Sequence, residues 1–168
     1  MHSFRHRLLG LPALALLIAA AGCSSGDATA STAVPSPDTK VAGLCRNLDK
    51  VLPRTVDGLD RKDPEPPSAL TAGWGSPAII LRCGVAQPPK MTDPKVARGD
   101  DPASVGGEVD GVGWLMEKQS DGSYRFTTTL RQAYVEVTLP KERADDGASV
   151  LVDLAPAVKR AIPEGIAL

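Results

Sequence analysis

In YRFTTTLRQAYVEVTL, residues 124–139, apolar and polar side chains alternate with a period of two, and this pattern is the strongest indication of the fold. The alternation predicts two strands, Tyr124–Leu130 and Ala133–Leu139, with a turn at Arg131 and Gln132. One apolar face and one polar face are typical of an antiparallel sheet that is covered on one side and wet on the other. Tyr124, Phe126, Thr128 and Leu130 share one face, and Val135, Val137 and Leu139 share another.

Two more strands are expected on the N-terminal side of this stretch. Val112–Lys118 alternates in the same way, and the turn Ser120-Asp121-Gly122 separates it from the next strand, so the three strands make a meander. The apolar run Ala78–Cys83 is typical of a strand that is buried on at least one face. Two segments rich in Pro, Gly and Asp, Asp57–Gly75 and Ala86–Gly107, are predicted as long surface loops.

A helix is expected at each end of the domain. Val41–Leu52 has apolar residues at helical spacing and stops at Pro53. The closing helix spans Leu151–Ile162, and its regular part begins near Asp153, which leaves Pro156 in the first turn. The predicted fold class is therefore α+β: a two-layer sandwich of about four antiparallel strands with an N-terminal helix, a C-terminal helix and one disulfide.

The first 22 residues are typical of an export signal. Arg5 and Arg7 precede the apolar run Leu8–Ala21, which is about 14 residues long and too short for a membrane-spanning helix of about 20. The run ends in Ala20-Ala21-Gly22-Cys23, which resembles the lipobox of bacterial lipoproteins, where the cysteine thiol receives a diacylglycerol. Two acyl chains are enough for stable anchoring. The alternative is an ordinary cleaved signal whose cysteine pairs elsewhere.

This interpretation divides the chain into three parts. Residues 1–22 are a lipoprotein signal peptide, residues 23–40 are a lipid-anchored flexible linker of small polar residues, and residues 41–168 are one α+β domain. The protein is expected on the outer face of the plasma membrane, held there by acylated Cys23. The membrane is thus its first predicted partner.

The other two cysteines, Cys45 and Cys83, are predicted to form a disulfide. Each lies on the apolar face of its element, and exported proteins fold where thiols that meet become oxidised. A redox or metal-binding role is the alternative, but neither a CxxC motif nor a third ligand accompanies the pair.

Composition narrows the possible functions. Both histidines, His2 and His6, lie within the signal, so the mature chain has none and a Ser-His-Asp or Cys-His arrangement is excluded. Removal of residues 1–22 leaves 17 basic and 20 acidic residues, a balance unlike that of nucleic-acid-binding proteins. We expect no metal, no cofactor and no nucleic-acid partner. Four acids, Asp100, Asp101, Glu108 and Asp110, fall close together, but their spacing matches no calcium loop.

A candidate binding surface lies on the polar face of the sheet. It comprises Arg82, Arg125, Tyr134 and Glu136, with Trp74 added from a predicted loop edge. Tyrosine and arginine are enriched where proteins bind one another. Cross-strand ion pairs on a solvated face explain the same residues without a ligand.

Several segments together resemble a known family. Cys45, ILRCG (Ile80–Gly84), VGW (Val112–Trp114) and FTTTLRQAYVEVTLP (Phe126–Pro140) are similar to actinobacterial lipoproteins classified as domain of unknown function 3515. The resemblance implies an envelope lipoprotein and supplies no catalytic residues.

The expected function is a non-catalytic binding or scaffold domain that engages an envelope protein, a glycan or a lipid. Two alternatives remain open: a histidine-free hydrolase or transferase that uses paired carboxylates, and a lipid or small-molecule carrier. The first needs two acids that face each other in a pocket. The second needs an apolar cavity between helices and sheet.

Overall fold

The predicted meander is present in the computed structural model of the chain, which describes residues 29–167. Its strands are β6 (Val112–Lys118), β7 (Tyr124–Thr129) and β8 (Val135–Leu139), and neighbouring strands are antiparallel. The registers align Met116, Phe126 and Val137 in one row across the sheet. The apolar side chains therefore gather on one face, as their alternation requires.

The sheet has six strands rather than the expected four or so, in the order β3-β4-β8-β7-β6-β5. The added strands are β3 (Thr71–Trp74) and β5 (Ser104–Val109), which lie mainly within the segments predicted as loops. Both contain glycine, and β3 has only four residues, so their own sequence favours a strand weakly. Pairing with β4 (Ile79–Cys83) and with β6 makes them strands. A separate two-stranded sheet joins β1 (Thr55–Val56) and β2 (Leu59–Asp60).

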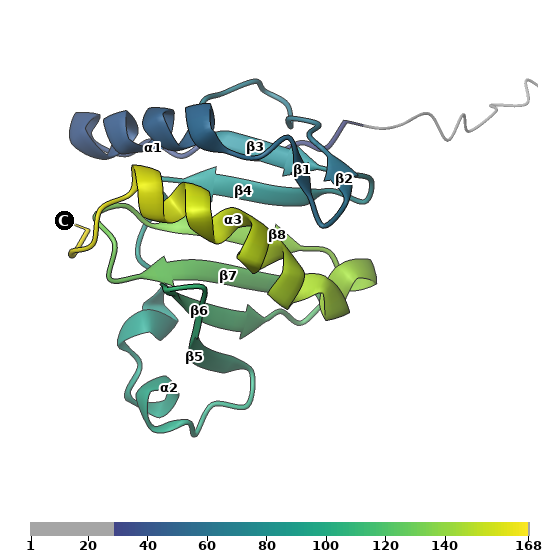
Figure 1. The fold of residues 1–168 in the computed structure, drawn as a ribbon. Coiled ribbons are helices and arrows are strands. Elements are labelled where there is room, and N and C mark those ends of the chain that lie inside the picture. The colour runs from purple at the N-terminus through teal and green to yellow at the C-terminus, as the bar shows by residue number, and fades with distance from the viewer. Residues whose placement is uncertain (1–28, 168) are drawn as a thin grey trace, which may run out of the picture.

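Helix α1 (Thr39–Val51) and helix α3 (Gly147–Ala161) lie side by side on one face of the sheet (Figure 1). The Asp38 carboxylate begins α1 by accepting hydrogen bonds from the N–H groups of Lys40 and Val41, at 2.8 and 3.0 Å. The helix ends just before Pro53, as predicted. The core is made of apolar side chains that project between this helix layer and the sheet.

Helix α3 begins earlier than the sequence suggested. It starts at Gly147 rather than near Asp153, and Pro156 lies inside it. A proline within a helix costs about 3 kcal/mol. The helix persists because it buries apolar residues on both sides of the proline, and each large side chain of this kind contributes about 1.5–3 kcal/mol. These residues are Val150, Leu151, Leu154, Ala155, Ala157 and Val158.

Much of the second face of the sheet is buried, which corrects the expectation that this face is exposed to solvent. Leu115, Glu117, Thr127 and Glu136 point to this face and are all buried. The segment between β4 and β5 carries a 3₁₀ turn, η1 (Pro89–Thr92), and the short helix α2 (Pro94–Arg98). α2 borders a hollow that Leu115 and Gly106 also line. A description as two layers is therefore only approximate.

The N-terminal end of the described chain lies on the body of the domain. The Ala30 carbonyl accepts a hydrogen bond from the Glu65 N–H (2.8 Å), and the Thr32 N–H donates to the Glu65 carbonyl (3.0 Å). Residues 30–38, which the sequence assigned to the linker, thus run along the domain before α1 begins. In the remaining connection between β8 and α3, η2 (Lys141–Asp146) leads into the helix.

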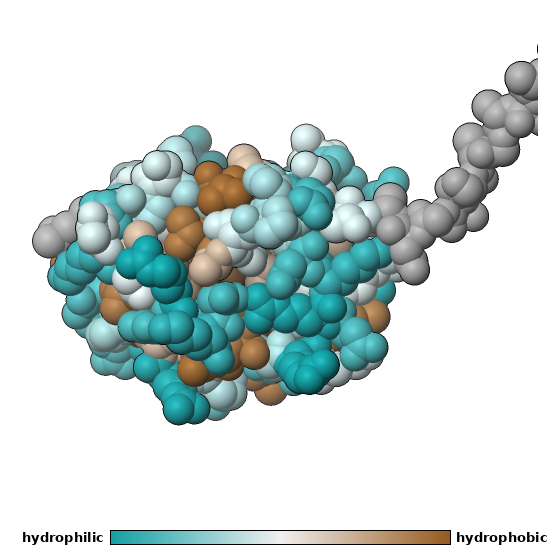
Figure 2. Space-filling model, turned by 90° about the horizontal axis from the view of Figure 1, so that it is seen from above, coloured by the Kyte–Doolittle hydropathy of each residue, from teal (hydrophilic) through white to brown (hydrophobic). Residues whose placement is uncertain are grey.

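Seen from above, the surface is mostly hydrophilic, with small separate apolar patches (Figure 2). None of the helices within residues 29–167 has the length and apolar character that crossing a membrane requires.

Candidate functional site

Four charged side chains cross the second face of the sheet and form what we call the charged ladder: Arg82, Glu136, Arg125 and Glu117. They come from β4, β8, β7 and β6 in that spatial order, so positive and negative charges alternate. The strand registers place Arg82 opposite Glu136 and Glu117 opposite Arg125. The period of two that sends apolar residues to the core sends these side chains to the opposite face.

The pair on β6 and β7 is bidentate. The Nε and Nη2 groups of Arg125 donate to the two carboxylate oxygens of Glu117, at 3.1 and 3.0 Å. These hydrogen bonds raise the pKa of Arg125 above its ordinary value, with a smaller contribution from the charge of Glu136. Two parallel bonds between guanidinium and carboxylate fix the geometry of both side chains.

The other pair is looser. Arg82 Nη1 lies 3.4 Å from Glu136 Oε1, and the buried Arg82 Nε has no hydrogen-bond partner among the described residues. The Thr127 hydroxyl, which lies opposite Glu136 on β7, is also buried without a partner in this part of the chain. A buried polar atom without a partner is uncommon in folded proteins. The ladder therefore retains hydrogen-bonding capacity between β4 and β7.

The carboxylates of the ladder are better shielded than its cations. The side chains of Glu117 and Glu136 are 7% and 11% exposed, whereas that of Arg125 is 35% exposed. Each buried acid faces an arginine rather than another acid. This arrangement neutralises charge and does not provide the pair of carboxylates that general acid and base chemistry needs.

We predict that Arg125→Met lowers the free energy of unfolding by about 1–2 kcal/mol, because it leaves the buried Glu117 carboxylate without its cation. The loss is smaller than the roughly 3–5 kcal/mol of a fully buried pair because Arg125 is partly solvated. The double variant Glu117→Leu/Arg125→Met should recover most of this loss. Urea unfolding followed by circular dichroism measures both, and a double variant no more stable than Arg125→Met would contradict the pairing.

Trp74 and Tyr134 do not belong to the ladder. Trp74 lies in β3 rather than on a loop edge, is completely buried on the helix side, and donates a hydrogen bond from Nε1 to the Pro53 carbonyl at 3.2 Å. Tyr134 is buried and lines a hollow with Pro37 and Val85 beside the start of α1.

Of the five residues proposed for the binding surface, the structure brings together Arg82, Arg125 and Glu136. Glu117 completes the set. Its alternation within Val112–Lys118 already placed it on this face, so the sequence carried the signal that identifies it.

Three of the four loop acids are paired with basic side chains. Asp101 pairs with Lys90, Asp100 with Arg98, and Asp110 with Lys159. Hydrogen bonding by Lys90 lowers the pKa of Asp101 below its ordinary value. Glu108 lies on β5. Within residues 29–167, no three His, Cys, Asp or Glu side chains are arranged to hold a metal ion.

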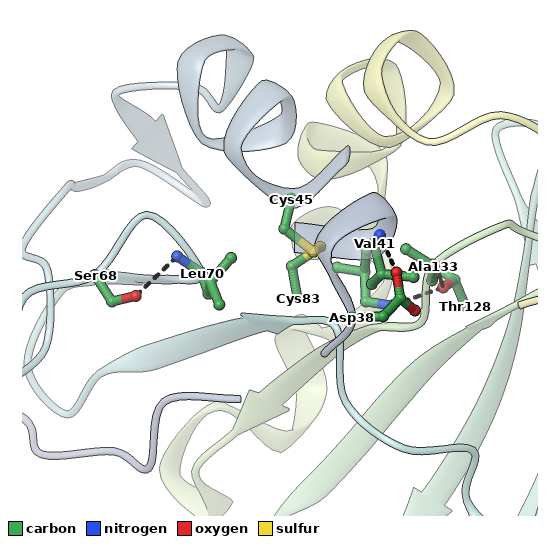
Figure 3. Close-up of a disulfide and its surroundings, with 9 residues drawn as sticks. Asp38, Val41, Cys45, Ser68, Leu70, Cys83, Thr128 and Ala133 are labelled. Atoms are coloured by element: carbon green, nitrogen blue, oxygen red, sulfur yellow. Dashed lines mark hydrogen bonds between the residues drawn. A yellow bond between two sulfur atoms is a disulfide. The ribbon is translucent and has the colours of Figure 1, made fainter. Parts of the chain in front are cut away.

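Cys45 of α1 and Cys83 of β4 form a disulfide, with their Cα atoms 5.5 Å apart (Figure 3). Both cysteines are almost completely buried, and the bond joins the helix layer to the sheet. Next to it, the space lined by Leu48, Leu70 and Leu81 leaves no volume for a water molecule. A second, more open hollow lies between α3 and the sheet and is lined by Val109, Met116, Phe126 and Leu151, so the carrier alternative stays a prediction. Cys23, the predicted lipidation site, lies outside the described residues.

Comparison with known proteins adds one match. A family model described as a protein of unknown function (DUF3515) matches residues 8–167. No curated protein and no solved structure matches the chain. The match takes in both the apolar run that begins at Leu8 and the folded domain.

Proposed function

Since the chain belongs to the DUF3515 family of proteins of unknown function, we propose from its own residues that it is an exported lipoprotein whose domain binds a partner at the cell envelope without catalysis. The observation that carries the choice of binding over catalysis is the charged ladder. Its two buried carboxylates, Glu117 and Glu136, each face an arginine. The alternative, a hydrolase or transferase that uses paired carboxylates, would need acids that face each other.

The lipid anchor is supported by the sequence Ala20–Cys23 and by the length of chain that follows it. Six Cα–Cα steps separate Cys23 from Thr29, the first described residue, and a fully extended chain covers about 20 Å in six steps. Because Ala30 is held against Glu65, an anchored domain would stay close to the membrane. We propose that the end of the domain around Glu65 faces the lipid headgroups.

Metabolic labelling tests the anchor. The full chain is produced in a high-GC Gram-positive host that is fed an alkynyl fatty acid, together with the variants Cys23→Ala and Ser24→Ala. Wild type and Ser24→Ala should carry the label and sediment with membranes, whereas Cys23→Ala should carry none. Unlabelled wild type, or a labelled Cys23→Ala variant, would refute acylation at this residue.

Crosslinking in intact cells tests the binding role. Mass spectrometry of the crosslinked, purified protein should identify a reproducible envelope partner, and repeated failure to capture one would contradict the binding role. Capture of a covalent substrate adduct on Glu117 or Glu136 would instead support a catalytic function.

A further inference from the structure

The two edges of the six-stranded sheet differ in how they are protected. At the β3 edge, the Lys62 N–H donates to the Gly73 carbonyl (2.8 Å), and the Gly75 N–H donates to the Asp60 carbonyl (3.1 Å). The chain that follows β2 thus covers this edge. At the β5 edge, residues 105–108 are exposed and no such backbone hydrogen bonds cover them within residues 29–167; α2 lies beside the strand and borders a hollow that Val105 and Gly106 line.

The register of β5 shows which of its backbone groups point outward. The turn Asp110-Gly111 has positive φ at both residues, 45° and 73°, and closes a hairpin in which Val109 pairs with Val112. In such a hairpin every second residue bonds to the neighbouring strand, so Val109, Gly107 and Val105 face β6. Gly106 and Glu108 therefore direct their N–H and C=O groups away from the sheet.

Nothing within their own chain requires glycine at the two glycine positions of β5. A Cβ atom at Gly106 or Gly107 would meet nothing within 4 Å, and neither residue has a positive φ. Glycine inside a strand weakens it, and it often marks a place where another backbone approaches closely. The strand also lacks proline and lysine, which commonly protect exposed edges.

We propose that β5 pairs with β5 of a second copy of this chain, antiparallel, across a twofold axis at Gly106. This register places Val105 opposite Gly107 of the other copy on the helix side of the sheet. Val105 is 49% exposed, and its side chain would fill the space that the partner's missing Cβ leaves open.

The same register bonds most of the remaining groups of the edge. The two Gly106 residues exchange a pair of backbone hydrogen bonds, and the N–H of Glu108 donates to the Ser104 carbonyl at each end. The Ser104 N–H is already bonded to the Asp101 carbonyl (3.3 Å), so the exposed Glu108 carbonyl is left to solvent. Glu108 lies beside a serine rather than a second carboxylate, so like charges do not oppose the pairing.

One strand pair buries a modest area, but two copies held on one membrane meet at a high effective concentration. This increase in effective concentration rests on the proposed lipid anchor. The register of the strand pair does not depend on the anchor.

Disulfide crosslinking in cells tests the register with two matched variants of the full chain. In the proposed pair the Cα atoms of the two residues at position 106 are about 5.5 Å apart, within disulfide range, whereas those at position 107 are about 7–8 Å apart. After brief oxidation, Gly106→Cys should give about fivefold or more covalent dimer than Gly107→Cys on non-reducing gels. Equal yields, no dimer, or crosslinking of the Gly106→Cys variant mainly to another protein would overturn the proposal.

A second substitution guards against loss of folding. Val105→Lys alters an exposed side chain, so circular dichroism should be unchanged, while the dimer yield of Gly106→Cys should fall about tenfold. An unchanged yield would overturn the pairing. Added Cys23→Ala should lower the yield of both cysteine variants and preserve their ratio, so that failure of the anchor and failure of the pairing give different results. If Gly106→Cys and Gly107→Cys give equal dimer yields while Cys23 is still acylated, the strand pairing is refuted and the anchor is not.

Discussion

Reduction of the Cys45–Cys83 disulfide should lower the free energy of unfolding by about 4 kcal/mol. The bond closes a loop with a sequence separation of 38, and the chain-entropy model gives about this value for a loop of that size. Domains of this kind are stable by only about 5–15 kcal/mol, so the loss is a large fraction of the total. Urea unfolding with and without dithiothreitol measures it.

The variant Cys45→Ala/Cys83→Ala separates the crosslink from the packing of the sulfur atoms. Its unfolding should not respond to dithiothreitol, and it should be slightly less stable than the reduced wild type because both positions are buried. A wild-type protein whose unfolding midpoint is the same in reductant would show that the disulfide does not hold α1 on the sheet.

Trp74→Ala should destabilise the domain by about 3–5 kcal/mol, the usual cost of removing a large buried aromatic side chain. Trp74 is completely buried, and its Nε1 group donates to the Pro53 carbonyl, where the chain leaves α1. The substitution leaves a cavity and an unpaired carbonyl together. Far-UV circular dichroism in urea follows the loss without relying on tryptophan fluorescence.

Trp74→Phe is the matched control because it keeps an aromatic ring and removes the N–H donor. It should cost about 1–2 kcal/mol. A Trp74→Ala variant that unfolds like wild type but no longer binds an envelope partner would contradict the packing role and support a role in recognition.

The central strands were predictable because alternation is a local property. Val112–Lys118 was predicted with its observed bounds, and Tyr124–Leu130 was predicted one residue longer than β7. Proline at position 53 marks the end of α1 from sequence alone. The positions of Cys45 and Cys83 on the apolar faces of their elements likewise follow from spacing.

The candidate site was only partly predictable. Arg82, Arg125 and Glu136 share a face because side chains alternate along their strands, and the sequence shows this alternation. Alternation does not predict how far these side chains are buried, since burial depends on what packs against that face. Trp74 was misplaced for the related reason that β3 becomes a strand only by pairing with β4.

The meander, the first helix and the phase of the two cysteines follow from local sequence, because each is set by neighbouring residues in the chain. Contacts between distant segments make strands of the glycine-containing β3 and β5 and carry α3 through Pro156. Such contacts also bury Glu117 and Glu136 on the polar face, where Arg125 stays partly exposed. In all three cases, contacts between distant segments outweigh a local preference of a few kcal/mol at most.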